Sequence, residues 1–268
     1  MLKCQQDLDN EPKVDFKMVG RNQATTFTGL CGKHDKELFK LIDDEELDFA
    51  NKEQLFLLAY RSVLRELHSK MKAAVDIQSI YTKAIELGRS DPNIPDEAMQ
   101  EATIAIYESY MFYRYKFSFD MIFQRQSFDD LVHEMLCIDT IYPSIAASSV
   151  FSPLDNIKQY VNRNDPKCVV LNVIPSKSTT TVVFSYKASH RDYVRHSIYD
   201  ILSASSYLRS YLLSKLILMH CENFVISPRC YREMGDDKKE AIKKYFMTNI
   251  FAEKTDYNDE RLLLFRTF

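Results

Sequence analysis

The feature that most constrains this fold is a long helical repeat of apolar side chains that begins near Asn51. Apolar or small residues return every three or four positions over the range 55–87, which is the period of an amphipathic α-helix. Asn51 is a favourable N-cap residue, Gln54 can complete a capping box, and Gly88 is a natural C-cap. The pattern therefore predicts a helix over residues 51–88, nearly forty residues that could contain a kink or a break.

The helical period recurs further along the chain. A loop with two prolines at residues 91–95 precedes a pattern that runs from Glu97 toward Phe123, with Asp96 as its N-cap. A short helix is expected after a turn at 31–35, and further helices are predicted over 128–138 and 236–246. Residues 193–219 are predicted to form one long helix or two short ones. Because only five of the 268 residues are glycine, a turn-dense all-β fold is disfavoured.

Strand patterns are strongest in the second half of the chain. Residues 168–174 and 179–186 are rich in β-branched side chains, and the intervening 175–178 segment contains proline and serine. This arrangement predicts an antiparallel hairpin, and residues 145–151 could add a strand. The predicted fold class is mainly α with a small antiparallel sheet (α+β), a helical bundle body with a β-hairpin in its C-terminal half.

Three regions follow from these patterns, and we expect them to form one continuous globular unit. Residues 1–45 are an irregular N-terminal segment with a Cys-x-x-His turn, in which 13–18 and 25–28 could form short strands. Residues 46–140 are a helical region, and residues 141–268 are an α+β region that packs on it.

Charge and cysteine usage narrow the classes of partner. A formal net charge of −3 provides no overall basic field for nucleic acid or an anionic membrane, although a local basic patch remains open. The first nine residues lack the features of a signal peptide, and charges interrupt the most apolar stretch, 198–224. Six scattered cysteines suggest free thiols, so we predict a cytoplasmic protein without a membrane partner.

Cys31 and His34 form the first candidate site. Two such ligands three residues apart on a tight turn can hold one Zn²⁺ from one side, and zinc is the one cofactor that the sequence suggests. A structural zinc needs four ligands, and Cys4 is the nearest spare thiolate, a possible third ligand. The alternative is a buried cysteine beside a surface histidine. A nucleophilic Cys31–His34 pair would lack a third, orienting group.

Longer sequence phrases around this pair carry a family resemblance. Residues 24–39 read ATTFTGLCGKHDKELF, residues 53–61 read EQLFLLAYR, and residues 220–228 read HCENFVISP. The chain resembles a group of uncharacterised bacterial proteins with the phrases ASTFTGFCxxHDxxLF and FLLAYRxxxxE. The resemblance covers most of the chain.

The resemblance implies a zinc-finger origin. Longer members of the group carry an upstream cysteine pair and a Ser-His, which suggests a treble-clef or HNH-like finger. In such a finger Cys31 and His34 would be the second half of the zinc site. This chain lacks that upstream half, so the general-base histidine of an HNH-like nuclease is missing. We expect either a natural short form or a start further upstream.

Three other constellations could carry chemistry. Arg61 and Arg65 share a helix face and could hold a phosphate, or they could pair with carboxylates inside a helix bundle. His220-Cys221-Glu222-Asn223 could form an acid–base site if burial raised the pKa of Glu222, or a structural hydrogen-bond network.

The third constellation is aromatic. Eight aromatic side chains are interleaved with Arg114, Lys116 and Arg125, and they could stack on nucleic-acid bases or form a helix core. The aromatic residues are Tyr107, Tyr110, Phe112, Tyr113, Tyr115, Phe117, Phe119 and Phe123.

We predict a binding or interaction protein that recognises a protein partner or a second copy of itself. The resemblance suggests a component of a bacterial mobile-element or anti-phage defence system. The alternative is a metal-dependent nuclease-related enzyme, active or degenerate. The sequence contains no HExxH, Walker A, G-x-S-x-G or GxGxxG motif, which weakens the enzymatic alternative.

Overall fold

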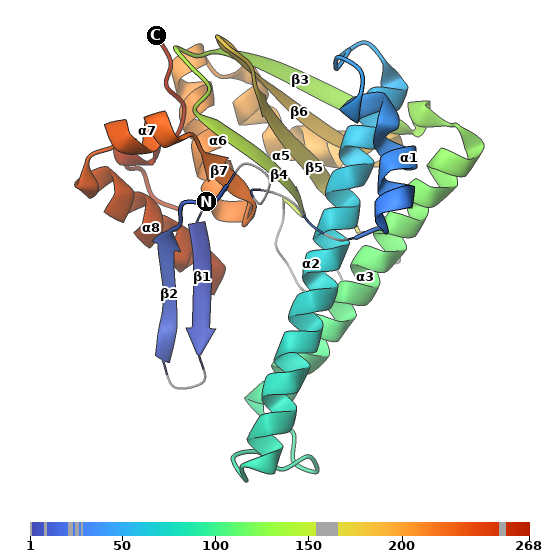
Figure 1. Cartoon of the computed structure of the whole chain (residues 1–268), viewed down its shortest axis with the longest axis vertical. Coiled ribbons are helices and arrows are strands. Elements are labelled where there is room, and N and C mark those ends of the chain that lie inside the picture. The colour runs from blue at the N-terminus through green and yellow to red at the C-terminus, as the bar shows by residue number, and fades with distance from the viewer. Residues whose placement is uncertain are drawn as a thin grey trace. The chain divides into compact units, whose positions relative to one another are not determined.

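The chain forms two compact units, which are described separately. The computed structural model describes residues 2–7, 10–20, 24, 27, 29–153, 166–251 and 256–268. The helical unit comprises residues 27–130 and 155–166, and the sheet unit comprises residues 1–26, 131–154 and 167–268 (Figure 1). Within the described part of the chain, no helix is both long and apolar enough to cross a bilayer.

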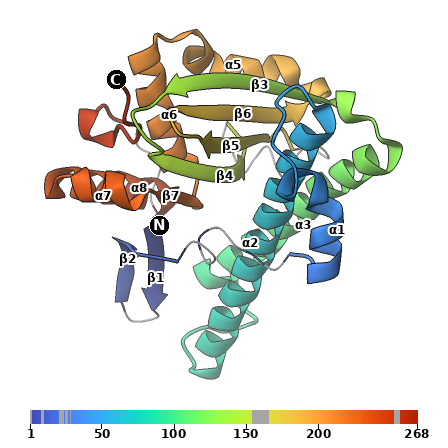
Figure 2. The same cartoon turned by 45° about the horizontal axis from the view of Figure 1, so that its top comes forward.

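Two long antiparallel helices dominate the helical unit, and they lie side by side in both views (Figures 1 and 2). Its elements are α1 (Gly32–Asp43), α2 (Lys52–Glu86), α3 (Glu97–Arg125) and the short 3-10 helix η1 (Phe128–Asp130). α2 is continuous, so the long helix predicted over 51–88 forms without a break. Gly88 follows its end with φ +67°, a conformation that suits glycine.

The start of α2 is capped as predicted, but Gln54 has a different role. The Asn51 side chain accepts hydrogen bonds from the backbone N–H of Glu53 and of Gln54, at 3.0 and 3.2 Å. The Gln54 side chain does not close a capping box. Its amide donates to the carbonyl oxygens of Leu41 and Glu46, at 3.1 and 3.2 Å, and so ties the end of α1 and the loop after it to the start of α2.

An aromatic cluster joins α2 to α3. Phe56 stacks on Phe119 with ring centroids 5.9 Å apart, and Tyr60 stacks on Phe119 at 6.2 Å. Phe56 and Phe119 are fully buried. The Tyr60 hydroxyl donates to Asp120 at 2.5 Å, so the polar end of this side chain is satisfied where the ring is buried.

The sheet unit is built on a five-stranded antiparallel sheet with the order β3-β6-β5-β4-β7. Its strands are β3 (Leu131–Asp139), β4 (Ile145–Phe151), β5 (Val169–Pro175), β6 (Thr179–Lys187) and β7 (Phe224–Ile226). The predicted hairpin is confirmed by β5 and β6, which pair with Val173 opposite Val182. A separate antiparallel hairpin is formed by β1 (Leu2–Asp7) and β2 (Asn10–Phe16).

The helices of this unit are α5 (Arg191–Ser203), α6 (Ser206–His220), α7 (Pro228–Glu233) and α8 (Asp236–Phe251), with the 3-10 helices η2 (Ala188–His190) and η3 (Glu260–Leu262). α5 and α6 lie along one face of the sheet (Figure 2), and α8 packs against α6. Alternate residues of β6, Val182 and Phe184, pack in one core cluster with Ile198 of α5 and Ile217 of α6. The period of two along the strand and of about four along the helices produces this shared core.

One prediction about the fold needs correction. The helix predicted over 128–138 is wrong, because residues 131–139 form strand β3 along its whole length against β6. For residues 193–219 the sequence allowed one long helix or two short ones, and the second alternative is confirmed by α5 and α6. Residues 25, 26 and 28 of the second predicted N-terminal strand lie outside the described residues.

The regional boundaries also differ from those predicted. The helical region expected over 46–140 ends at residue 130, where the sheet unit takes over. The N-terminal segment 1–45 is divided: its first part belongs with the sheet unit, and its last part, including α1, belongs with the helical unit. The overall class, mainly helical with a small antiparallel sheet, is confirmed.

Candidate functional site

Cys31 and His34 lie together at the start of α1. Cys31 is the N-cap residue of this helix, and its Sγ lies 3.2 Å from Nδ1 of His34 in the first turn. In tetrahedral zinc sites, ligand bonds of about 2.3 Å to sulfur and about 2.0 Å to nitrogen place the two ligand atoms about 3.5 Å apart. The pair therefore has nearly the spacing needed to bind one metal ion. Both side chains are exposed, so the alternative of a buried cysteine is wrong.

Further ligands for this pair are not found in the described part of the chain. No group of three or more His, Cys, Asp or Glu side chains there has an arrangement that could hold a metal ion. Cys4, the third ligand considered from the sequence, lies in β1 opposite Val14, and its side chain lies outside the described part. Within what is described, Cys31 and His34 lie together without a third possible ligand, and zinc binding by this pair stays a prediction.

The His220–Asn223 segment joins α6 to the sheet. The His220 ring stacks on Phe151 with centroids 4.4 Å apart, and burial lowers the pKa of His220 to about 4. The Ser149 hydroxyl donates to the His220 carbonyl at 3.1 Å. Glu222 is exposed, so it lacks the burial that the acid–base hypothesis required. These contacts support the structural alternative.

Arg61 is engaged in a partly exposed ion pair of the helical unit. Its guanidinium donates to both carboxylate oxygens of Asp43, at 2.7 and 2.6 Å, and stacks over the Phe39 ring at 4.1 Å. Arg65 is also partnered. The arrangement agrees with the hypothesis that these arginines pair within a helix bundle, because a bidentate ion pair leaves Arg61 few donors for a phosphate.

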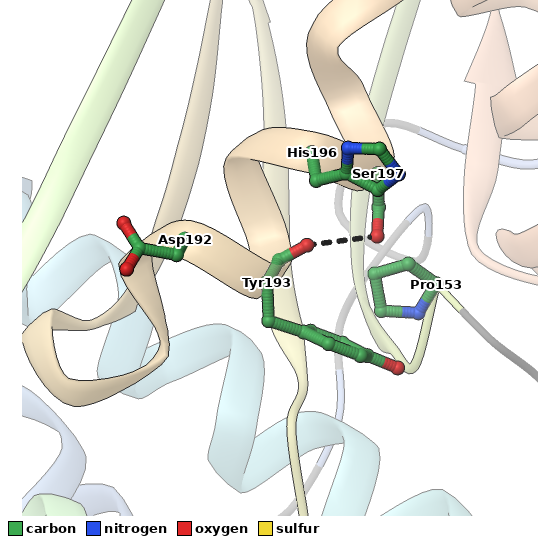
Figure 3. Close-up of a pocket in the computed structure, with 5 residues that line it drawn as sticks. All are labelled: Pro153, Asp192, Tyr193, His196 and Ser197. Atoms are coloured by element: carbon green, nitrogen blue, oxygen red, sulfur yellow. Dashed lines mark hydrogen bonds between the residues drawn. The ribbon is translucent and has the colours of Figure 1, made fainter.

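An open pocket of about 540 Å³ on α5 brings together residue types that resemble a hydrolase triad (Figure 3). Asp192, His196 and Ser197 line it. The Asp192 carboxylate points away from His196, and the Ser197 hydroxyl donates to the Tyr193 carbonyl at 3.0 Å. A catalytic serine needs a base within hydrogen-bond reach. Among the described residues that line the pocket no such contact is formed, so Asp192, His196 and Ser197 are not arranged as a catalytic triad.

The aromatic stretch of α3 separates into two faces. Phe112, Tyr115 and Phe119 are buried, as the helix-core alternative expected. The second face, which we call the α3 face, consists of Ile106, Tyr110, Tyr113 and Phe117. These side chains retain 44%, 54%, 53% and 52% of their accessible surface.

The spacing of the α3 face is regular. Its four residues follow one another at intervals of four, three and four positions, so they form a single stripe along the helix. At 100° per residue, Arg114 and Arg125 lie on one flank of this stripe. Asp120 and Lys116 lie on the other, joined by an ion pair of 2.8 Å. The α3 face is thus an aromatic stripe with a basic flank.

The sequence places Tyr107, Tyr110 and residues 113–114 in one helical stripe that is typical of a core, and this prediction is wrong for Tyr110 and Tyr113. The structure shows that Tyr110 and Tyr113 are exposed, while residues one or two positions away are buried. A helix that is apolar on two sides is the signal that could have indicated this. It would have shown that one neighbouring helix cannot cover all of these side chains.

Comparisons with protein-family profiles, with curated proteins and with solved structures found no match.

Proposed function

We propose that this chain is an interaction protein that binds a helix of a protein partner on its α3 face. The observation that supports this proposal is the exposure of about half of each of the four apolar side chains in that stripe. Isolated exposed apolar residues are ordinary on protein surfaces, whereas contiguous patches often mark binding sites.

The size of the surface suits a small interface. Large aromatic side chains bury about 150–250 Å² each, so four side chains that are half exposed offer roughly 400 Å². The largest patch on a typical monomer covers about 300–600 Å² and is often functional. With an equal contribution from a partner, the α3 face would form the apolar centre of an interface near the small, transient end of the known range.

The chemistry of the stripe favours a partner helix with acidic flanks. Intervals of four, three and four residues are those at which two helices interlock their side chains. Arg114 and Arg125 along one edge would attract carboxylates. Tyrosine and arginine are also the residue types that dominate the binding energy of protein interfaces.

A nucleic-acid partner is less well supported by the same surface. Strong binding to a phosphate backbone needs many basic contacts. The flanks of the α3 face carry Arg114, Lys116 and Arg125 over about three turns, and Lys116 pairs with Asp120. These are few basic groups for a phosphate backbone.

A designed peptide tests the proposal. We would titrate the chain with a fluorescent 21-residue amphipathic helix that has leucines at the contact positions and glutamates on both flanks. The same peptide with lysines in place of glutamates is the charge control. We expect micromolar binding of the glutamate peptide in fluorescence anisotropy, and binding at least tenfold weaker for the lysine peptide.

Matched variants locate the binding surface. Tyr113→Glu combined with Phe117→Glu should weaken glutamate-peptide binding at least tenfold. Ile104→Glu, on the opposite side of the same helix and also exposed, should leave it unchanged. Equal affinity for both peptides, or loss of binding only in Ile104→Glu, would refute the proposal. A salt-dependent shift of oligo-dT that disappears in Arg114→Gln would assign the surface to nucleic acid instead.

The biological setting is part of the proposal. The resemblance of the sequence to a group of bacterial proteins supports a role in a mobile-element or anti-phage defence system. The cysteines whose side chains are described are free thiols, which supports a reducing compartment such as the cytoplasm.

A metal-dependent, nuclease-related function is the second candidate, and the spacing of Cys31 and His34 favours it. This function predicts about one zinc per chain in the purified protein, lost in Cys31→Ser and retained in Cys137→Ser, which removes another exposed thiol. Elemental analysis by mass spectrometry measures the zinc. Metal-free protein, or equal zinc in both variants, would rule out this candidate and leave the α3 face proposal untouched.

A further inference from the structure

A second cavity lies in the sheet unit, at the end where β4 and β7 pair. We call it the edge pocket. It has a volume of about 300 Å³. Its walls are formed by the segment after β2, the start of β4, the end of β5, and β7 with the residues that follow. Its lining includes Phe16, Lys17, Met18, Ala146, Ile226 and Tyr231.

The frame of the edge pocket is held by hydrogen bonds and strand pairing. Ile145 of β4 pairs with Ile226 of β7, and the Ser227 N–H donates to the Ser144 carbonyl at 2.8 Å. The Arg266 N–H donates to the Ser144 hydroxyl at 3.1 Å. These contacts fix the floor of the pocket, so the cavity does not depend on the rotamer of one side chain.

One wall of the edge pocket is more open. Phe16 packs against Tyr231 with ring centroids 5.2 Å apart, and this contact anchors the segment after β2. Two residues further, Met18 retains 88% of its accessible surface. Methionine is flexible and adapts its shape to irregular apolar ligands, so Met18 can close over a bound molecule.

The lining has a clear chemical bias. Most of the described lining residues are apolar, and Lys17 is the single charged residue among them. An apolar cavity with a few polar groups is typical of sites for small molecules, and the sign of the charge selects against a cationic ligand.

We propose that the edge pocket binds a small monocarboxylate with an apolar chain of about eight carbons. Each molecule in liquid water takes up about 30 Å³. A cavity of about 300 Å³ therefore holds about ten non-hydrogen atoms of similar size. Octanoate has that number of non-hydrogen atoms. The chain fills the apolar cavity, and the carboxylate lies toward Lys17. This site is independent of the α3 face, which belongs to the other unit.

Three ligands with eight carbons each test the chemistry. Octanoate, 1-octanol and octylammonium carry an anionic, a neutral and a cationic head group. We expect calorimetry to show that affinity falls in the order octanoate, octanol, octylammonium. Octanoate should bind with a submillimolar dissociation constant and at least tenfold more tightly than octylammonium. Methyl NMR signals of Ile145, Val225 and Ile226 should shift on addition of octanoate.

Two variants separate the cavity from the charge. Ala146→Leu fills the cavity and should abolish the NMR shifts for all three ligands. Lys17→Gln should weaken the binding of octanoate and leave the binding of octanol unchanged, so that the two ligands bind with similar affinity. Lys177→Gln, an exposed lysine in the turn between β5 and β6, is the matched control and should behave as the unchanged protein.

Binding that depends neither on the charge of the head group nor on the cavity would overturn the proposal. Equal affinity for octanoate and octylammonium would contradict the role of Lys17. Unchanged binding in Ala146→Leu, or shifts at methyl groups away from the pocket, would place the ligand elsewhere. An absence of binding at 10 mM octanoate in a protein with an intact NMR spectrum would end the proposal.

Discussion

Two histidines of the sheet unit are kept neutral by their surroundings. Burial lowers the pKa of His220 and the pKa of His133 to about 4, from an ordinary value of 6.5. His133 contacts the Ser185 hydroxyl at 2.8 Å, and His220 stacks on Phe151. Their native environments therefore disfavour the imidazolium form.

These shifts predict acid sensitivity. Between pH 6.5 and pH 4 the unfolded chain binds protons at these histidines and the native protein does not, so the free energy of unfolding falls as the pH falls. We expect each histidine to remove about 2 kcal/mol between pH 7 and pH 5. His220→Phe keeps the ring contact with Phe151 and should lose about half of this pH dependence in urea unfolding. An identical pH dependence in protein with and without the substitution would contradict the assignment.

At the scale of elements, the long regular patterns could be predicted and the short ones could not. α2 repeats its period over 35 residues, and β5 with β6 carries dense β-branched sequence around a turn. In β3, however, Leu131, Val132, Met135 and Leu136 are spaced as on a helix. Its pairing with β6 overrides that local preference. β7 has only three residues, which is too few to show any period.

The candidate sites also divide into one that a local sequence pattern predicts and one that it does not. Cys31 and His34 are three residues apart, so helix geometry alone brings them together and the sequence could indicate the pair. The edge pocket combines the segment after β2 with β4 and β7, which are far apart in the chain. Only the tertiary fold brings these segments into contact, and no local pattern could have revealed the cavity.

At the scale of the whole molecule, the two units have separate cores. Phe119 belongs to the aromatic cluster of the helical unit, and Phe184 belongs to the core of the sheet unit. Phe119→Ala should cost about 3–5 kcal/mol locally, because it leaves a cavity where a fully buried ring was. We expect amide hydrogen exchange to speed up in α2 and α3 and to stay unchanged in β5 and β6.

A substitution in the core of the sheet unit provides the control. Val182→Ala should speed up exchange in β5 and β6 and leave α2 and α3 as they were. Equal acceleration in both units by either substitution would show that they open as one cooperative structure.

The division of the chain also sets the order in which it can fold during synthesis. Residues 27–130 form a nearly continuous unit that can assemble while the ribosome is still working. The sheet unit must wait, because Leu262, Leu264 and Phe265, close to the C-terminus, belong to its core. The β1–β2 hairpin is synthesised before its partners in α7 and α8, which Phe16 and Asp15 contact. Its nascent strands must therefore stay soluble until those helices have been made, a period in which a chaperone that holds extended segments would protect them.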